Sequence, residues 1–484
     1  MISNSARNWP GRMSKTVYIT TTLPYVNADP HLGFALELVQ ADVVVRAARL
    51  AGREVFFNTG TDEHGLKIYR AAAAAGLTSQ AYADRGAVKF RALLSALDVS
   101  PEVNFIRTTD PGHIAAAQEF WRRAAAAGDI YKKNYQLKYC VGCELEKTES
   151  ELTAGHCPLH SNQELEIIEE ENYFFRFSKY QKPLLELYAA QPDFVVPGSR
   201  LNEVREFVAR GLADFSISRL ASKQPWGISV PEDPLQTTYV WFDALVNYVS
   251  AIGWPDNEQN FKKWWPVIQF AGKDNLRQQA AMWPAMLMSV GLPPPRQIIV
   301  HGFVTSGGQK MSKSLGNVID PFALINDYGA DAVRYYLLRH ITPFEDSDFT
   351  IEKFKETYNA NLANGLGNLV SRVMKMAHTH QVRIKGNYRP LIAQPDLEKF
   401  EFNKASDRIW KLIADCDTLI QIKKPFSLIK TDPAQAKIDI GSLLIYLADI
   451  ASLLQPLMSK TSAAITDLIR TNRPPTQPLF PRKN

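Results

Sequence analysis

The stretch VYITTTLPYVNADPHLGF, residues 17–34, decides how the first part of this chain folds. Its first six residues are apolar or β-branched and predict a strand, whereas the apolar spacing from Leu32 to Val43 predicts a helix. A helix N-terminus presents unpaired backbone N–H groups, so the turn between the two suits the phosphates of a nucleotide. Gly33 lets a flat base approach the backbone, and His31 can donate to phosphate oxygens.

Strand and helix patterns alternate on both sides of a long insertion. The segments, in the order strand, helix, strand, are 17–22, 31–51 and 55–58, then 266–271, 275–290 and 297–300. Such βαβ units build parallel sheets. From about residue 351 apolar residues recur at helical spacing instead. The sequence therefore predicts an α/β fold, a split Rossmann-like parallel-sheet domain with an insertion, followed by an all-α bundle.

A second short motif, KMSKS at residues 310–314, follows the polar, Gly-rich stretch 306–309. This composition predicts a mobile loop that carries Lys310 and Lys313. Mobile cations are useful where negative charge builds up only in the transition state. The ordered pair formed by this motif and the first one resembles the two signatures of class I aminoacyl-tRNA synthetases.

The cysteine spacing predicts a metal site within the insertion. Cys140 and Cys143 are separated by two residues, as are Cys157 and His160. Zinc prefers a tetrahedron of thiolate and imidazole ligands, and two-residue loops let paired ligands reach one ion. No further ligand or catalytic acid lies nearby in the sequence, so one structural Zn²⁺ is expected. The fourth cysteine, Cys416, is expected in the core of a helix.

Composition sets outer bounds on function. The 484 residues are 45% hydrophobic and 22% charged, as in soluble globular proteins of two to four domains. The net charge of +5 permits a polyanionic partner without requiring one. No apolar run reaches membrane-spanning length, and residues 1–15 lack the apolar middle of a secretory signal. A cytoplasmic protein without membrane association is expected.

Further motifs extend the resemblance over almost the whole chain. They are 59–65 (TGTDEHG), 170–175 (EENYFF), 239–244 (YVWFDA), 272–274 (GKD), 283–287 (WPAML) and 300–302 (VHG). The full set resembles the bacterial methionyl-tRNA synthetase family, in its branch with a single zinc knuckle. This resemblance implies that ATP with Mg²⁺, L-methionine and methionine tRNA are the substrates. It also implies a methionyl-adenylate intermediate and the release of AMP and diphosphate.

The resemblance assigns roles by position. The catalytic positions match His31, Lys310 and Lys313. The ATP-binding positions match His31, Gly33, Phe34, Arg219, Lys273, Asp274, His301, Lys310 and Lys313. Asp62 matches the acid that holds the methionine ammonium, and the rest of the methionine pocket matches Leu23, Tyr25, Trp241, Ala244, Tyr248 and Gln279. Aromatic and aliphatic walls suit a soft thioether. The anticodon-binding positions match Asn368, Arg372 and Phe426.

Three departures from the family pattern concern these roles. Phe34 stands where the ATP motif usually ends in a second histidine. Gln278 and Gln279 stand where many members carry an aromatic residue and a histidine that close the methionine pocket. Phe426 replaces a common tryptophan, which keeps a stacking face of smaller area.

The expected domain order follows from the resemblance and the patterns together. It is a disordered extension (1–15), the first half of the catalytic domain (16–120), a connective insertion with the zinc knuckle (121–225, knuckle 140–160), the second catalytic half (226–314), a stem-contact connector (315–350), an anticodon-binding helical domain (351–473) and a tail (474–484). The Pro-rich tail is expected to be poorly packed. Because the chain ends soon after the bundle, a monomer is expected.

Two other functions remain open at this point. Another class I synthetase is disfavoured, because the isoleucyl, valyl and leucyl enzymes carry a longer editing insertion and a cysteinyl enzyme would need zinc ligands from the catalytic domain. A catalytically inactive relative that only binds RNA is disfavoured by His31, Asp62 and Lys310, although Phe34 keeps it open. ATP–pyrophosphate exchange with single amino acids separates these alternatives.

Overall fold

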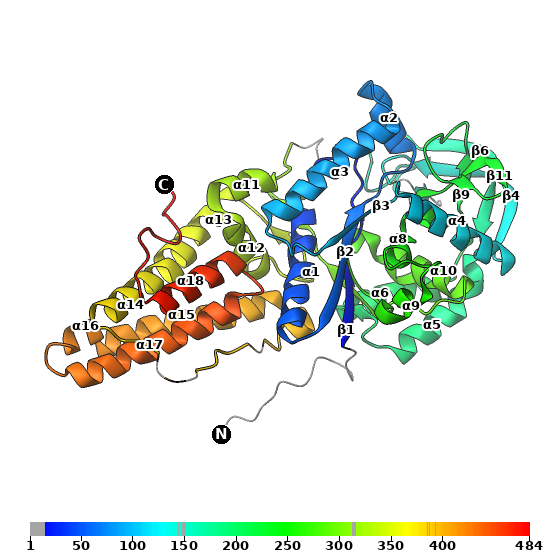
Figure 1. Cartoon of the computed structure of the whole chain (residues 1–484). Helices are drawn as coiled ribbons and strands as arrows, with labels where there is room; N and C mark the ends of the chain where they lie inside the picture. Colours follow the sequence, from blue (N-terminus) through cyan, green and yellow to red (C-terminus); the bar gives the residue numbers. More distant parts are fainter. Residues whose placement is uncertain are drawn as a thin grey trace.

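The computed structural model describes residues 15–143, 145–147, 152–311, 316–384, 386, 388–392 and 394–484. An α/β part and a helical bundle lie end to end, so the molecule is elongated (Figure 1). The predicted N-terminal extension, 1–15, lies outside the described residues except for Lys15.

A six-stranded parallel sheet with the strand order β3-β2-β1-β12-β13-β7 forms the centre of the α/β part. Its strands are β1 (Thr16–Thr20), β2 (Glu54–Thr61), β3 (Asn104–Arg107), β7 (Val195–Val196), β12 (Ile268–Gly272) and β13 (Gln297–His301). β1 pairs with β2 on one side and with β12 on the other, where Ile19 lies opposite Ile268. The two halves of the split fold meet at β1, which confirms the predicted α/β class.

The two faces of this sheet are buried in two different cores. On β1, Val17 and Ile19 belong to one core and Tyr18 to the other, as the two-residue period of a strand requires. Helices α1 (Leu32–Leu50) and α3 (Ser79–Ala96) contribute to the first core, and α4 (Pro111–Ala126) and α10 (Trp283–Ser289) to the second. The shorter helices of this part are α2 (Leu66–Ala74), α7 (Val240–Ala244), α8 (Asn247–Ser250) and α9 (Glu258–Trp264).

Two small antiparallel sheets are built from the insertion 121–225 and the chain that follows it, since two strands of the second sheet, within 229–238, lie beyond residue 225. One has the order β5-β4-β6-β8 and the other β10-β11-β9. Their strands are β4 (Ile130–Cys140), β5 (Leu145–Lys147), β6 (Glu166–Phe175), β8 (Phe215–Ser216), β9 (Ser218–Leu220), β10 (Ser229–Val230) and β11 (Asp233–Thr238). Between them the chain forms α5 (Gln181–Ala190) and α6 (Gly198–Ala209).

The segment 121–225, predicted as an insertion outside the nucleotide fold, also supplies an edge strand of the central sheet. β7 pairs in parallel with β13, where Val195 lies opposite Ile298. A strand of two residues is too short to show a periodic pattern, so the sequence gives no sign of it.

The C-terminal part is helical, as predicted. After α11 (Pro321–Tyr328) and α12 (Ala330–Arg339) it comprises α13 (Ile351–Thr357), the π-helical η6 (Tyr358–Gly367), α14 (Asn368–Thr379), α15 (Phe402–Lys423), α16 (Pro425–Leu428), α17 (Pro433–Leu454) and α18 (Ser459–Thr471). In Figure 1 α16 lies at the end of the bundle remote from the sheet.

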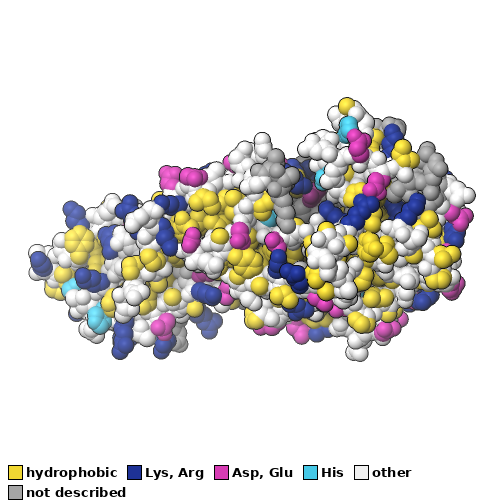
Figure 2. Space-filling model, turned by 90° about the horizontal axis from the view of Figure 1, so that it is seen from above, with side chains coloured by type: hydrophobic (Ala, Val, Ile, Leu, Met, Phe, Trp, Pro, Cys, Tyr) yellow, Lys and Arg dark blue, Asp and Glu magenta, His cyan; other side chains and the backbone are white. Residues whose placement is uncertain are grey.

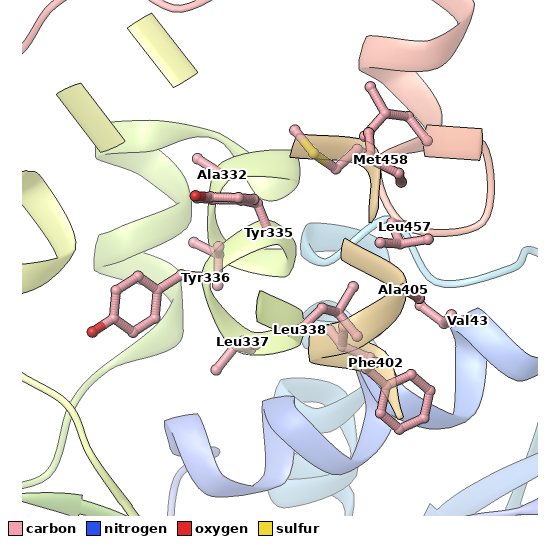
Figure 3. Close-up of a cluster of buried hydrophobic side chains, with 14 of the residues drawn as sticks. Val43, Ala332, Tyr335, Tyr336, Leu337, Leu338, Phe402, Ala405, Leu457 and Met458 are labelled. Carbon is pink, nitrogen blue, oxygen red and sulfur yellow. The ribbon is translucent and has the colours of Figure 1, made fainter. Parts of the chain in front are cut away.

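The bundle and the α/β part share one hydrophobic core, with α12 at the junction. Tyr335 and Leu338 of α12 belong to the same core as Val43 of α1 and Phe402 of α15 (Figure 3). Apolar contacts therefore run without interruption from the central sheet into the bundle.

A buried ion pair crosses this junction. The Arg334 side chain is fully buried, and its Nη1 lies 2.8 Å from Asp42 Oδ2. Arg334 also donates from Nε to the carbonyl of Leu457, at 2.7 Å. Burial alone would raise the pKa of Asp42, but Arg334, Arg46 and hydrogen bonds from Ser100 hold it below its ordinary value.

The tail differs from its prediction. Phe480 is buried in the shared core, the Tyr358 hydroxyl donates to the carbonyl of Pro481 at 2.9 Å, and Asn359 makes two hydrogen bonds with the backbone of Lys483. Proline-rich composition indicates only the absence of regular structure, and one aromatic anchor is enough to dock such a segment. Among the described helices, none is both long and apolar enough to cross a membrane.

Candidate active site and metal knuckle

Four parallel strands of the central sheet end at one cavity of about 490 Å³. The chain just beyond β1, β2, β12 and β13 contributes Thr22, Asp62, Asp274 and Gly302 to its wall. In open α/β sheets this carboxyl edge is the usual place for a ligand. Of the residues predicted for ATP and methionine, the wall includes Leu23, Tyr25, His31, Gly33, Phe34, Asp62, Trp241, Ala244, Tyr248, Asp274, Gln279, His301 and Lys310.

His31 caps the N-terminus of α1 at this cavity. Its Nδ1 accepts a hydrogen bond from Gly33 N at 3.1 Å, which places the proton of the neutral ring on Nε2. Leu32 N donates to the carbonyl of Ile319, so the first N–H groups of α1 are not free, in contrast to the prediction. Burial lowers the pKa of His31, and Lys310 lowers it further. The Nε2–H of a neutral His31 is therefore the donor that remains for an anionic ligand.

A buried ion pair between Glu37 and His301 supports the same wall. Glu37 accepts hydrogen bonds from the backbone and the hydroxyl of Thr22, at 2.6 and 2.7 Å, and lies 2.9 Å from His301 Nε2. The other ring nitrogen of His301 contacts the Gly302 carbonyl at 2.8 Å. Burial disfavours charge on His301, but Glu37 and the carbonyl outweigh it and raise its pKa. Two acceptors on one ring favour the imidazolium form.

The lysine motif begins on a small sheet of β14 (Val304–Ser306), β15 (Gln309–Lys310) and β16 (Ser347–Asp348). Lys310 Nζ lies 3.2 Å from Asp274 Oδ2 and 4.3 Å from the centre of the Phe303 ring. Lys273 lies 4.4 Å from the same ring, pairs with Asp346 at 2.7 Å, and is not part of the cavity wall. Lys313 lies outside the described residues.

The predicted methionine residues line the same cavity. A parallel backbone bridge joins Tyr25 to Asp62, with Asp62 N donating to the Pro24 carbonyl at 2.9 Å. The Tyr25 hydroxyl donates to the carbonyl of His64. The bridge holds the backbone of the buried Asp62 beside that of Tyr25.

Gln279 and Tyr248, which both line the cavity, form a polar contact. Gln279 Nε2 donates to the Tyr248 hydroxyl at 2.8 Å, and Gln269 Nε2 donates to Gln279 Oε1 at 3.3 Å. Both glutamines at 278 and 279 lie on η4 (Gln278–Met282), a π-helical turn where the sequence predicts a regular helix. Single π turns are frequent at functional sites. The amide at 279 is therefore tied to the tyrosine rather than loose in the cavity.

A polar network that the sequence analysis missed connects two segments that contribute to the cavity wall. Asp243 accepts from His64 Nδ1 at 2.7 Å and from His113 Nε2 at 2.8 Å, and it is completely buried. Burial would raise the pKa of Asp243, but the two imidazoles hold it below its ordinary value. The network joins the 59–65 motif to α7, which carries Trp241 and Ala244.

Arg219, predicted to contact ATP, is not part of the cavity wall. Its side chain is buried and lies between the rings of Tyr139 and Tyr239, at 5.3 and 4.7 Å from their centres. Its Nη1 donates to Ser216 Oγ and to the Ser218 carbonyl, both at 2.7 Å. A residue-by-residue match gives the position of a side chain in the sequence but not its direction in space.

The Cys/His knuckle is assembled as its spacing predicts. The ligand atoms of Cys140, Cys143, Cys157 and His160 all lie within 4.8 Å of one another. A Cβ on Gly142 would lie 2.5 Å from the His160 ring, so only glycine fits there. This set suits one tetrahedral metal ion with no open position. Cys143 and His160 also line the cavity, so the knuckle borders the active site.

The predicted anticodon residues lie on the bundle. Asn368 is exposed at the start of α14, Arg372 pairs with Asp417 of α15 at 3.1 Å, and Phe426 of α16 is 51% exposed. On the face in Figure 2, Lys and Arg side chains lie over both the bundle and the α/β part. An exposed aromatic face is suited to stacking on an unpaired base.

Comparison with known proteins gives a consistent result. The family model described as "tRNA synthetases class I (M)" matches residues 17–166 and 146–374. A methionine–tRNA ligase of Thermosynechococcus vestitus is 52% identical over 75% of this chain and 70% of its own length. One from Synechocystis is 44% identical over 93% of this chain and 88% of its own length.

Solved structures agree. Mycobacterium tuberculosis methionyl-tRNA synthetase in complex with methionyl-adenylate is similar with a TM-score of 0.89 and 37% identity, over 97% of this chain and 100% of the other. The cavity and the knuckle agree with these comparisons. The chain belongs to the methionine–tRNA ligases, in the class I tRNA synthetase family.

Proposed function

We propose that the cavity at the carboxyl edge of the sheet is where this chain activates L-methionine with ATP. One observation carries the proposal: a single cavity wall combines the buried acid Asp62 and several aromatic rings with His31 and Lys310. Asp62 would hold the ammonium group, and Tyr25, Trp241 and Tyr248, with Leu23, Ala244 and Gln279, would surround the side chain.

His31, Gly33, Phe34, Asp274, His301 and Lys310 would hold ATP with its Mg²⁺. A carboxylate oxygen of methionine then attacks the α-phosphorus, and diphosphate leaves. In the second step the terminal ribose hydroxyl of methionine tRNA attacks the acyl carbon, and AMP leaves. Donors that meet the developing phosphate charge lower the barrier most, which suits His31 and the lysine motif. The role of Lys313 stays a prediction.

The first test is ATP–pyrophosphate exchange with each amino acid supplied singly. Methionine should support exchange, and isoleucine, valine, leucine and cysteine should not. Exchange with another amino acid would point to a different class I synthetase. No exchange with any of them, together with retained tRNA binding, would point to an inactive RNA-binding relative.

We also propose that the knuckle holds one structural Zn²⁺, and elemental analysis of the purified protein should find about one zinc per chain. Cys143→Ser should lose most of it, because a hydroxyl is a poor substitute for a thiolate. Cys416→Ser removes a buried thiol outside the knuckle and should keep the full content. No zinc in the wild type, or two per chain, would contradict the assignment.

Anticodon binding by the bundle is a separate proposal. Base stacking and a bidentate contact are each worth about 1–3 kcal/mol, so Phe426→Ala and Arg372→Ala should each reduce charging of methionine tRNA by about tenfold or more. Methionine-dependent exchange without tRNA should stay near the wild-type rate, because the cavity is intact. Asn368 would pair with a base edge beside them.

Ile422→Ala is a suitable control, since Ile422 is a 72% exposed apolar side chain at the end of α15. It should leave both activities unchanged. A parallel loss of exchange and charging in the Arg372 variant would mean that Arg372 stabilises the fold. No loss of charging in either variant would place anticodon binding elsewhere on the bundle.

The domain limits given above, a cytoplasmic location and a monomeric state complete the proposal.

A further inference from the structure

We propose that Arg219 is a positioning residue that couples the metal knuckle to the part of the cavity wall that is proposed to hold methionine. The inference rests on the proposed function, because that function assigns methionine to the wall that contains Trp241. It gives Arg219 a task at the amino acid, in place of the ATP contact that the sequence suggested.

A small hydrophobic cluster, distinct from the two large cores, connects the two places. Its buried members are Tyr139, Tyr239 and Val240, and the partly buried Tyr25, Val141 and Trp241 pack against it. Tyr139 and Val141 flank the knuckle ligand Cys140 at the end of β4. Tyr239 caps α7, whose second residue is Trp241. The cluster therefore joins the base of the knuckle directly to the amino-acid wall.

Arg219 holds the two tyrosines of this cluster together. The guanidinium lies 5.3 Å from the Tyr139 ring centre and 4.7 Å from that of Tyr239, and the residue is only 4% exposed. Among the side chains that the structure describes, no carboxylate pairs with it, so aromatic faces, a hydroxyl and a carbonyl stabilise the buried charge. A cation that contacts aromatic faces after losing its water interacts strongly with both.

The backbone next to Arg219 fixes its position relative to α7. In the pairing of β9 with β11, Arg219 lies opposite Thr237, two residues before Tyr239. Tyr239 N donates to the Ile217 carbonyl at 2.8 Å. On the α7 side backbone pairing thus holds the geometry, whereas on the knuckle side the contact of Arg219 among the described residues is with the Tyr139 ring. A shift of the knuckle would reach Trp241 through this stacked pair.

Methionine affinity measured by isothermal titration calorimetry without ATP tests the coupling. Arg219→Met keeps the length but removes charge and planar stacking, and should weaken methionine binding by about tenfold, since small misplacements of binding groups have effects of this size or larger. ATP affinity should stay within about twofold. Arg219→Lys keeps the charge without the planar group, so its methionine affinity should lie between that of the wild type and that of Arg219→Met.

Arg176→Met is the matched control, because Arg176 also stacks on a tyrosine of the insertion, Tyr131, at 4.4 Å, outside the cavity wall. It should bind methionine as the wild type does. Circular dichroism would show whether Arg219→Met folds. If it does not, Tyr139→Leu still tests the coupling, because it removes one aromatic face and should weaken methionine binding.

Metal removal completes the test. Dialysis of the wild type against a chelator should weaken methionine binding, and the same treatment of Arg219→Met should add little, because the connection is already broken. Unchanged methionine affinity in Arg219→Met, additive effects of chelation and substitution, or a selective loss of ATP affinity would each overturn the inference. A wild type that binds no methionine would instead contradict the proposed function.

Discussion

Replacement of Asp62 by alanine should reduce methionine-dependent ATP–pyrophosphate exchange by about a hundredfold or more. Removing one partner of a buried, hydrogen-bonded charge pair costs about 2–5 kcal/mol, and the methionine ammonium would lose its carboxylate in a mostly buried site. The fold should survive, because the backbone of Asp62, rather than its side chain, makes the bridge to Tyr25. The measurement is the exchange rate at saturating ATP over a range of methionine concentrations.

Asp439→Ala provides the comparison for this variant. Asp439 has the same 6% exposure as Asp62 but lies on α17 of the bundle. It should keep wild-type exchange, so that the loss is specific to the cavity rather than to any buried aspartate. Near-normal exchange in Asp62→Ala would mean that the amino-acid pocket is elsewhere.

Replacement of Arg334 by methionine should lower the free energy of unfolding by about 3–5 kcal/mol, because it breaks a buried ion pair and leaves Arg46 as the one cation paired with Asp42 among the described side chains. The carbonyls of Leu457 and Pro456 would also lose their donor. The shift of the urea midpoint, followed by circular dichroism, measures this effect.

Arg339→Met is the matched control on the same helix. Arg339 pairs with Asp407 at 2.8 Å, but that carboxylate side chain is 62% exposed, so the loss should be about 0–1 kcal/mol. If both variants lost the same small amount, the junction would not depend on the buried pair.

The strand and helix patterns were sufficient to predict the fold class, whereas the resemblance to the family named most of the cavity residues. The parallel sheet explains why His31 and Asp62 meet, since residues that follow parallel strands converge at one edge. The knuckle needed only short-range spacing, because two-residue loops largely fix where the ligands lie. Membership of the family, inferred from motifs, was confirmed by the relatives.

What the sequence did not predict depends on side-chain direction and long-range packing. Arg219 was assigned by its match to a basic residue of the resembling family, yet its side chain lies buried between two tyrosine rings and is not part of the cavity wall. Phe480 docks the tail on the core, although the Pro-rich composition of the tail suggests no docking. Glu37 left one usable signal, a carboxylate within the apolar run 32–39, since such a group must be paired when buried. Its partner His301 is 264 residues away in the sequence, and no local pattern connects them.

The continuous core through α12 has a mechanical consequence. Domains that share apolar side chains and a buried ion pair cannot hinge against each other without exposing both, so the cavity and the far end of the bundle keep a fixed separation. If α16 contacts the anticodon as proposed, the fixed distance from α16 to the cavity limits the length of tRNA that can contact both. The adjustment that brings the acceptor end of the tRNA to the adenylate would then have to come from the RNA, which bends at its unpaired terminus.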